Sequence, residues 1–255
     1  MNWSVLDLSI IGPALIAGLL VTATHVPLGQ RVLERGIIFL DLAVAQVAGL
    51  GIITAYRFEW EPGGWKMQAI AMSAAILGVL LLNYTEKRWP DIQEALIGSL
   101  FVLASSGSIL LLATNPHAGE QLRELLVGQI LWVSYEQLIP VIILYGIILL
   151  LWFSIAQSAS SLYFYLLFAL SITASVQLVG VYLVFATLIL PALAIRKVKN
   201  FSLGFGYLIG GIGYLTGLVF SAVLDMPAGA MIVYSLTLTT MTIGWVLNKK
   251  RGSLI

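Results

Sequence analysis

Long apolar stretches recur along the whole chain, and short polar segments separate them. Each stretch is near the ~20 residues that an α-helix needs to cross the hydrocarbon core of a bilayer. Strands of a membrane barrel would instead alternate apolar and polar residues with a period of two. The pattern predicts an all-α integral membrane protein, a polytopic bundle of about nine (eight to nine) transmembrane helices in one domain, residues 1–255. We place the spans at residues 5–27, 37–56, 67–83, 93–114, 137–156, 161–178, 179–195, 203–223 and 229–247.

Two stretches do not fit a simple succession of spans. Residues 161–195 form an unbroken apolar run that is too long for one span, and we expect it to fold back at QLVG, 177–180, where Gly180 favours a turn. Residues 121–138, QLRELLVGQILWVSYEQL, have an apolar centre too short to cross the bilayer, with charges on both sides. A short re-entrant or interfacial helix fits this length, and a surface amphipathic turn fits it equally well.

Composition agrees with the pattern, because 60% of the 255 residues are hydrophobic and only 10% are charged. A soluble domain has roughly 25% charged residues. The net charge of +1 gives no reason to expect a nucleic-acid partner, and the lack of cysteine excludes disulfides and thiolate metal sites. No polar region is large enough to form a soluble catalytic domain, so we expect any catalytic activity to reside in another polypeptide.

The distribution of basic residues predicts the orientation of the spans, because short loops rich in Lys and Arg stay in the cytoplasm. Nine spans place ten basic residues on one side and three on the other, which predicts an external N-terminus and a cytoplasmic C-terminus. The loops at 58–65 and 115–124 are then external. The cytoplasmic set is Arg31, Arg35, Lys87, Arg88, Arg196, Lys197, Lys199, Lys249, Lys250 and Arg251.

Glycines are frequent in SLGFGYLIGGIGYLTGL, residues 202–218. A phosphate-binding loop needs a preceding strand, whereas these glycines lie inside a span. Gly206 with Gly210, and Gly213 with Gly217, have the small-xxx-small spacing that lets membrane helices approach closely. We therefore expect them to serve helix packing.

Three polar or helix-breaking features stand out in the apolar background. Asp41 heads the run FLDLAVAQVAGLGII, 39–53, where a charge is costly unless it is used or neutralised. Pro191 lies near the inner end of its span and frees a backbone carbonyl. The stretch Asp225-Met-Pro227-Ala-Gly229 is typical of an external turn before the last span, with Asp225 as its N-cap and Pro227 in the first turn. A purely structural role is an alternative for the last two features.

The order and spacing of several segments resemble one family over nearly the whole chain. The chain is similar to the membrane permease subunits of the zinc/manganese-type ABC importers. We give most weight to the LILPALA helix with its basic turn, followed by D-x-P-A-G before the last span. The resembling segments are VPLGQRVLERGIIFLDLAVA (26–45), LVGVYLVFATLILPALAIRK (178–197) and FSAVLDMPAGAMIV (220–233), with weaker similarity in EALIGSLF (94–101) and ELLVGQIL (124–131).

This resemblance implies a divergent permease subunit that imports a divalent metal ion, zinc or manganese, across a bacterial plasma membrane. It implies a homodimer in the lipid bilayer, served by a separate ABC ATPase subunit and an extracytoplasmic substrate-binding protein. ATP hydrolysis would belong to the partner, so we expect no enzyme activity and no cofactor in this chain.

The chain departs from the family at the helix that carries Asp41. In the family, this aspartate is followed four residues later by a histidine, so that both face one side of the helix and serve a divalent cation. Here that position is Ala45, and Gln46 lies about 140° from Asp41, so Gln46 replaces the histidine only if the helix bulges. Asp41 remains the tentative metal ligand.

The two histidines are His25, which we place at the end of the first span, and His117 in an external loop, so the sequence offers no intramembrane pair. Asp41 has an alternative role in which it pairs with Arg31 or Arg35 at the inner interface.

A second departure concerns the ATPase. In the family, a cytoplasmic segment between the fifth and sixth spans docks into the ATPase, whereas here AQSASSLY, 156–163, is short and uncharged. Either docking occurs elsewhere, for example through the loops at 84–92 and 196–202 with Lys87, Arg88, Arg196 and Lys197, or this divergent member no longer uses ATP in the usual way.

Three alternatives stay open beside the importer. The first is a non-transporting membrane scaffold of the same fold, and the second is a permease for a non-metal substrate. The third is an ion-coupled transporter, which the scarcity of intramembrane carboxylates disfavours.

Overall fold

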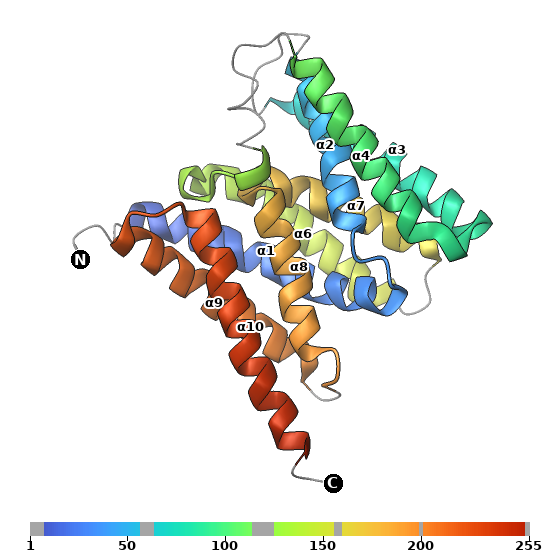
Figure 1. Ribbon diagram of the computed structural model, residues 1–255. Coiled ribbons are helices and arrows are strands. Elements are labelled where there is room, and N and C mark those ends of the chain that lie inside the picture. Colours follow the sequence, from blue (N-terminus) through green and yellow to red (C-terminus); the bar gives the residue numbers. More distant parts are fainter. Residues whose placement is uncertain (1–7, 57–63, 114–124, 156–159, 199–200, 253–255) are drawn as a thin grey trace. The chain divides into compact units, whose positions relative to one another are not determined.

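The computed structural model describes residues 8–56, 64–113, 125–155, 160–198 and 201–252, and every regular element in these ranges is helical (Figure 1). Seven of the helices in this part of the chain are long and apolar enough to cross a membrane, and α2 and α8 are shorter apolar helices. The all-α membrane architecture is therefore confirmed. The helices are α1 (Leu8–Arg35), α2 (Leu40–Tyr56), α3 (Trp65–Arg88), α4 (Gln93–Leu112), α6 (Tyr135–Ile155), α7 (Ser161–Val179), α8 (Val181–Ile195), α9 (Ser202–Leu224) and α10 (Ala228–Gly252), with short 3-10 turns η2 (Pro90–Ile92) and η3 (Ile130–Trp132).

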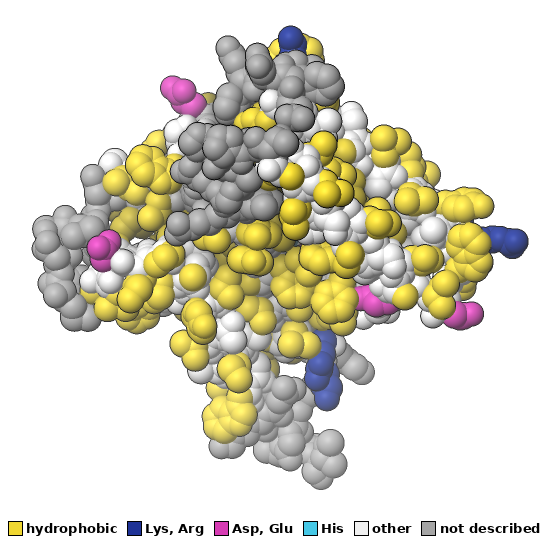
Figure 2. Space-filling view, turned by 45° about the horizontal axis from the view of Figure 1, so that its top comes forward, with side chains coloured by type: hydrophobic (Ala, Val, Ile, Leu, Met, Phe, Trp, Pro, Cys, Tyr) yellow, Lys and Arg dark blue, Asp and Glu magenta, His cyan; other side chains and the backbone are white. Residues whose placement is uncertain are grey.

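Many large apolar side chains are exposed, as a lipid-facing surface requires. Leu103 and Leu110 of α4 are 70% and 75% exposed, and Leu150 of α6 is 65% exposed. Hydrophobic side chains cover most of the coloured surface in Figure 2, and only a few charged side chains appear among them. In water such a surface would favour aggregation, whereas in the hydrocarbon core of a bilayer its exposure carries no free-energy penalty.

The fold-back at Gly180 is confirmed. Helix α7 ends at Val179 and α8 begins at Val181, and the single residue between them has a φ of 81°. Only glycine adopts this backbone conformation without steric cost.

The first helix is longer than the span predicted at 5–27, because α1 continues through Pro27 to Arg35. Proline has no N–H, so Pro27 deprives the carbonyl of Ala23 of its helical donor. The hydroxyl of Tyr207 in α9 donates to that carbonyl at 3.4 Å. This contact between residues far apart in sequence compensates for the lost helical bond, so the helix does not end at the proline.

The chain forms two compact units, each assembled from segments that are distant in sequence. The first unit comprises residues 1–35, 127–145 and 178–255, and the second comprises residues 36–126 and 146–177. The assignment of residues 1–255 to one permease domain stays a prediction.

In the first unit, α1 and α9 pack through small residues at four-residue intervals. A Cβ on Gly210 would lie 2.3 Å from Cγ2 of Thr22, and one on Gly206 would lie 2.5 Å from Cγ1 of Val26. A different face of α9 packs on α10, where a Cβ on Gly213 would lie 2.4 Å from Cδ2 of Leu236. The predicted packing role of these glycines is confirmed, because substituents would force the helices apart.

In the second unit, α2, α3 and α4 lie side by side (Figure 1). A Cβ on Gly51 of α2 would lie 3.0 Å from Cβ of Ala74 in α3, and one on Gly78 of α3 would lie 3.2 Å from Cγ1 of Val47 in α2. Close approach of α2 and α3 therefore relies on small residues on both helices.

In the described part of the segment predicted at 121–138, helical residues 125–127 and the turn η3 are separated by Gly128, which has a φ of 72°. Residues 121–124 lie outside the described ranges, and the described residues do not form one continuous helix. A Cβ on Gly128 would lie 2.2 Å from the carbonyl oxygen of Val179, and one on Gly180 would lie 2.3 Å from the backbone nitrogen of Gly128. The two glycines therefore bring one backbone directly against another, and the helix breaks where this contact is made.

Candidate functional site

Asp41 lies in the first turn of α2 and is only 1% exposed. Neither of its carboxylate oxygens has a hydrogen-bond partner among the described residues. It heads a buried row with Ala45, Ala48 and Ile52, which are spaced to share one helix face. The positive end of the helix dipole favours an anion at this position, but the desolvated carboxylate still needs a proton or a cation.

The alternative in which Asp41 pairs with Arg31 or Arg35 stays open, because these arginines belong to the first unit and Asp41 to the second. Arg31 donates to Glu34 of its own helix at 2.9 Å, and this ion pair is exposed. No described side chain donates to Asp41. Within the second unit, the described residues therefore supply no hydrogen-bond partner for this carboxylate.

Ala45 and Gln46 do not rebuild the family's histidine. Helix α2 runs without interruption from Leu40 to Tyr56, so the bulge that would bring Gln46 to the face of Asp41 is absent from it. Gln46 is half-buried on a different face, and Ala45 is fully buried. The condition under which Gln46 would replace the histidine is therefore not met, because a regular helix fixes its position about 140° away from Asp41.

Pro191 lies inside α8, where it leaves the carbonyl of Thr187 without its helical donor. The Thr187 hydroxyl donates to the carbonyl of Leu183 at 2.7 Å and lies 2.8 Å from the hydroxyl of Tyr214 in α9. Because of Pro191, a backbone carbonyl, that of Thr187, lacks its helical hydrogen bond within a buried, apolar helix.

The turn before the last helix differs from its prediction. Asp225 is the C-cap of α9, with a φ of 53°, and is not the N-cap of α10. Its N–H donates to the carbonyl of Ser221, whereas the carbonyl of Pro227 accepts the first bond of α10 from Met231. Because so few residues join the two helices, the chain must reverse directly after α9, and aspartate tolerates the left-handed conformation better than most residues.

Gly229 supports a close backbone contact in the first unit. A Cβ on it would lie 2.8 Å from the carbonyl oxygen of Val127, the neighbour of Gly128. Three glycines from separate resembling segments, Gly128, Gly180 and Gly229, therefore converge on residues 127 and 128. Their role here is structural.

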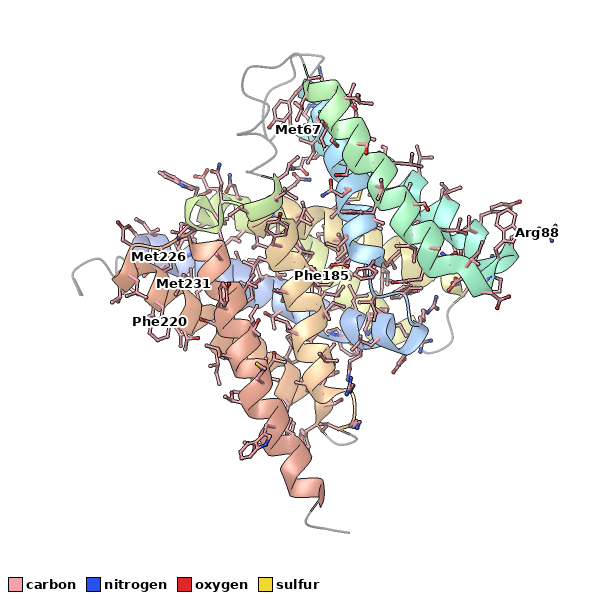
Figure 3. The ribbon with its side chains drawn as sticks, viewed as in Figure 1. Met67, Arg88, Phe185, Phe220, Met226 and Met231 are labelled. Carbon is pink, nitrogen blue, oxygen red and sulfur yellow. The ribbon has the colours of Figure 1, made fainter. Side chains whose placement is uncertain are left out.

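The predicted docking residues lie at exposed helix ends. Lys87 and Arg88 are exposed in the last turn of α3, and Figure 3 shows the side chain of Arg88 directed away from the neighbouring helices of its unit. In the first unit, Arg196 and Lys197 are exposed in the turn after α8. Helix α6 ends at Ile155 and α7 begins at Ser161, so the connection is as short as predicted, although residues 156–159 lie outside the described ranges.

A buried polar network fixes the turn between α3 and α4. The Thr85 hydroxyl lies 3.0 Å from the side-chain oxygen of Gln93, whose amide nitrogen donates to the carbonyl of Leu82 at 2.9 Å and to Tyr165 of α7 at 3.3 Å. Ser161 at the start of α7 donates to Glu86. These bonds join α3, α4 and α7, and the sequence did not reveal them because their partners are up to 75 residues apart.

His25 lies further from the end of its helix than the span predicted at 5–27 implies. Because α1 continues to Arg35, His25 lies well inside this helix and is fully buried. Its Nδ1 lies 3.0 Å from the Thr24 hydroxyl, and its Nε2 has no partner among the described residues. The other histidine, His117, lies outside the described ranges, and the described residues contain no group of three His, Cys, Asp or Glu that could hold a metal.

Comparisons with known proteins agree with this architecture. The manganese transport system membrane protein MntC of Halalkalibacterium halodurans is 25% identical over 98% of this chain and 91% of its own length. The high-affinity zinc uptake system membrane protein ZnuB of Haemophilus influenzae is 23% identical over 88% of this chain and 92% of its own. A solved structure of PsaBC from Streptococcus pneumoniae in complex with Fab superimposes with a TM-score of 0.71 at 20% identity, over 91% of this chain and 90% of that one, and confirms the fold.

The ABC 3 transport family matches residues 7–164 and 154–246. These ranges include α2 with Asp41, α8 with Pro191 and the turn at Asp225. The match confirms the resemblance to the membrane subunits of metal importers. The chain is a multi-pass membrane protein that belongs to the ABC 3 transport family.

Proposed function

We propose that this chain is the permease subunit of an ABC importer for a divalent metal ion, zinc or manganese. It works in the bacterial plasma membrane as a homodimer, with a separate ATPase and an extracytoplasmic binding protein. The names of the relatives support a metal substrate, because one is a manganese protein and another a zinc protein. The permease itself provides a path and catalyses no bond chemistry.

The observation that carries the proposal is the buried, unpartnered carboxylate of Asp41. An ionisable group in an apolar span is expensive, and such groups mark the paths of ions and substrates. A carboxylate supplies the hard oxygen ligand that suits manganese, and it also binds zinc. A non-metal substrate or a scaffold role gives no account of this isolated charge.

Coupling to the ATPase is proposed at two basic turns. Lys87 and Arg88 precede η2 in the second unit, and Arg196 and Lys197 follow α8 in the first. The hydrogen bond from Ser161 to Glu86 connects the first of these turns to the start of α7. A movement of the turn between α3 and α4 is therefore transmitted to α7. The short α6–α7 connection supports this choice, since it leaves little chain for a docking helix.

Metal uptake by cells that express the transporter tests the proposal through Asp41→Asn. The amide keeps the side chain's shape and removes the charge that attracts a divalent ion, so uptake of manganese and zinc should fall by about tenfold or more. Glu136→Gln is the control, because Glu136 is exposed in the first turn of α6 and lies outside the proposed docking turns. Expression and dimerisation should be unchanged in both variants.

Uptake that survives Asp41→Asn in a well-expressed protein would contradict the metal path through α2. A wild-type chain that takes up neither metal, yet assembles with its partners, would favour the non-metal permease or the scaffold.

A further inference from the structure

The buried His25 uses one ring nitrogen and leaves the other without a partner. The Thr24 hydroxyl lies 3.2 Å from the carbonyl of Val21, which can only accept its proton. We therefore assign the proton of the 3.0 Å contact between Thr24 and the imidazole to Nδ1 of His25. In a neutral imidazole this leaves a lone pair on Nε2, which is the atom without a partner. His25 thus presents a free ligand atom inside a membrane helix.

The position of His25 directs it toward α8 and α9. It lies seven residues after Gly18 and four residues before Gly29, so all three share one face of α1. On this face, a Cβ on Gly18 would meet the ring of Tyr214 in α9, and one on Gly29 would meet the carbonyl of Leu188 in α8. His25 therefore lies along the seam where α1 packs against α8 and α9, all within the first unit.

Oxygen atoms in the same seam carry free lone pairs. Because the Thr187 hydroxyl lies 2.7 Å from the carbonyl of Leu183, which can only accept, we assign the donor of the 2.8 Å bond between Thr187 and Tyr214 to Tyr214. The phenol oxygen of Tyr214 then keeps its own lone pairs. The Thr187 carbonyl lacks its helical donor because of Pro191. All three side chains, of His25, Thr187 and Tyr214, are fully buried.

We propose that this seam is a transit site for a transition-metal dication, with Nε2 of His25 as its nitrogen ligand and the Thr187 carbonyl and Tyr214 hydroxyl as oxygen donors. The inference rests on the proposed function, and it adds a ligand set in the first unit to the carboxylate of the second. Imidazole suits zinc and other late transition metals, and neutral oxygens suit manganese. A site without a carboxylate binds weakly, which a path requires, because an ion must leave each site as readily as it enters.

Binding of Mn²⁺ to the full-length chain in lipid nanodiscs tests this site directly. The chain carries a purification tag without histidine, and pulsed electron paramagnetic resonance detects ¹⁴N coupled to the bound Mn²⁺. Wild type should show nitrogen coupling, and His25→Gln should abolish it and weaken binding by about tenfold or more. His117→Gln is the matched control, since it removes the other histidine, and it should leave both results unchanged.

A second variant tests the oxygen donors and does not depend on His25. Pro191→Ala restores the N–H that Thr187 lacks, so its carbonyl is engaged within the helix and becomes a poorer ligand. We expect weaker Mn²⁺ binding, with thermal stability that is unchanged or higher. Unchanged affinity in this variant would overturn the role of the carbonyl.

The outcomes separate this inference from the proposed function. Metal uptake by wild type without nitrogen coupling, or coupling that persists in His25→Gln, overturns the transit site and leaves the importer intact. Nitrogen coupling from His25 in a chain that takes up no metal supports the site and overturns the importer.

Discussion

Gly128 and Gly180 are the residues at which backbone conformation and packing are most tightly linked. Both have positive φ, 72° and 81°, and each would place a Cβ within 2.3 Å of the other's segment. Neither constraint alone would require glycine as strictly as the two together. These glycines let the segment at 127–128 approach the start of α8 more closely than any side chain permits.

Gly128→Ala should therefore lower the stability of the folded protein markedly. The positive φ alone costs about 1–3 kcal/mol, and the steric overlap with the backbone of Val179 adds to it. The control is Gly98→Ala in α4, where a Cβ would meet nothing within 4 Å, and which should stabilise the helix by about 0.5–1 kcal/mol. Thermal unfolding in detergent measures both, and equal midpoints for the two variants would refute the contact.

Some single residues could be interpreted from the sequence and others could not. The turn at Gly180 was predictable, because an apolar run of that length must fold back and glycine marks the place. The position of His25 within its helix was not predictable, since it depends on whether α1 continues beyond Pro27. That depends on the hydroxyl of Tyr207, 184 residues away, which donates to Ala23. The N-cap assigned to Asp225 failed for a similar reason, because the short connection had to reverse the chain at that residue.

At the scale of elements, the turn from α3 to α4 combines a rigid interior with an exposed basic edge. Gln93 and Thr85 are buried and hydrogen-bonded, whereas Lys87 and Arg88 face outward. Tyr84 and Trp89, both exposed, lie beside these basic residues with their ring centroids 6.4 Å apart. A fixed element with a charged, aromatic surface is suited to contact a partner protein, in keeping with the proposed docking role.

Replacing both Lys87 and Arg88 by Glu should weaken association with the ATPase subunit without affecting folding. Charge reversal at an interface acts mainly on the association rate and on its salt dependence. Lys66→Glu is the control, because Lys66 is exposed at the opposite end of the same helix. Co-purification at several salt concentrations measures the effect, and a complex that is indifferent to the double change would rule out this turn as the docking site.

Gln93→Leu should test the interior of the same turn. The leucine removes the hydrogen bonds that the Gln93 side chain makes with Thr85, Leu82 and Tyr165. Loss of a buried polar partner costs about 1–3 kcal/mol. A thermal midpoint equal to that of wild type would show that the network does not stabilise the turn.

At the scale of the whole molecule, contacts between helices that are distant in sequence hold each unit together. In the first unit, Val26 of α1 packs with Ile195 at the end of α8 and Ile209 of α9. In the second unit, Glu94 at the start of α4 accepts a hydrogen bond from the N–H of Phe39, just before α2. The helix number followed from apolar length alone, whereas the division into two units follows from contacts that no local pattern encodes.

The orientation in the membrane remains a prediction, with an external N-terminus and a cytoplasmic C-terminus. Reporter fusions at Pro62 and His117 should report external positions, and fusions at Lys87, Lys199 and Arg251 should report the cytoplasm. The reverse pattern would overturn the assignment of Lys87 and Arg88 to the side of the ATPase.

The most direct test of the importer is the metal content of cells that lack this chain. Under zinc and manganese limitation, deletion should lower the accumulation of at least one of the two metals. The wild-type chain should restore it, and a chain with Asp41→Asn should not. Unchanged zinc and manganese contents after deletion, with the ATPase and binding protein still present, would contradict the account.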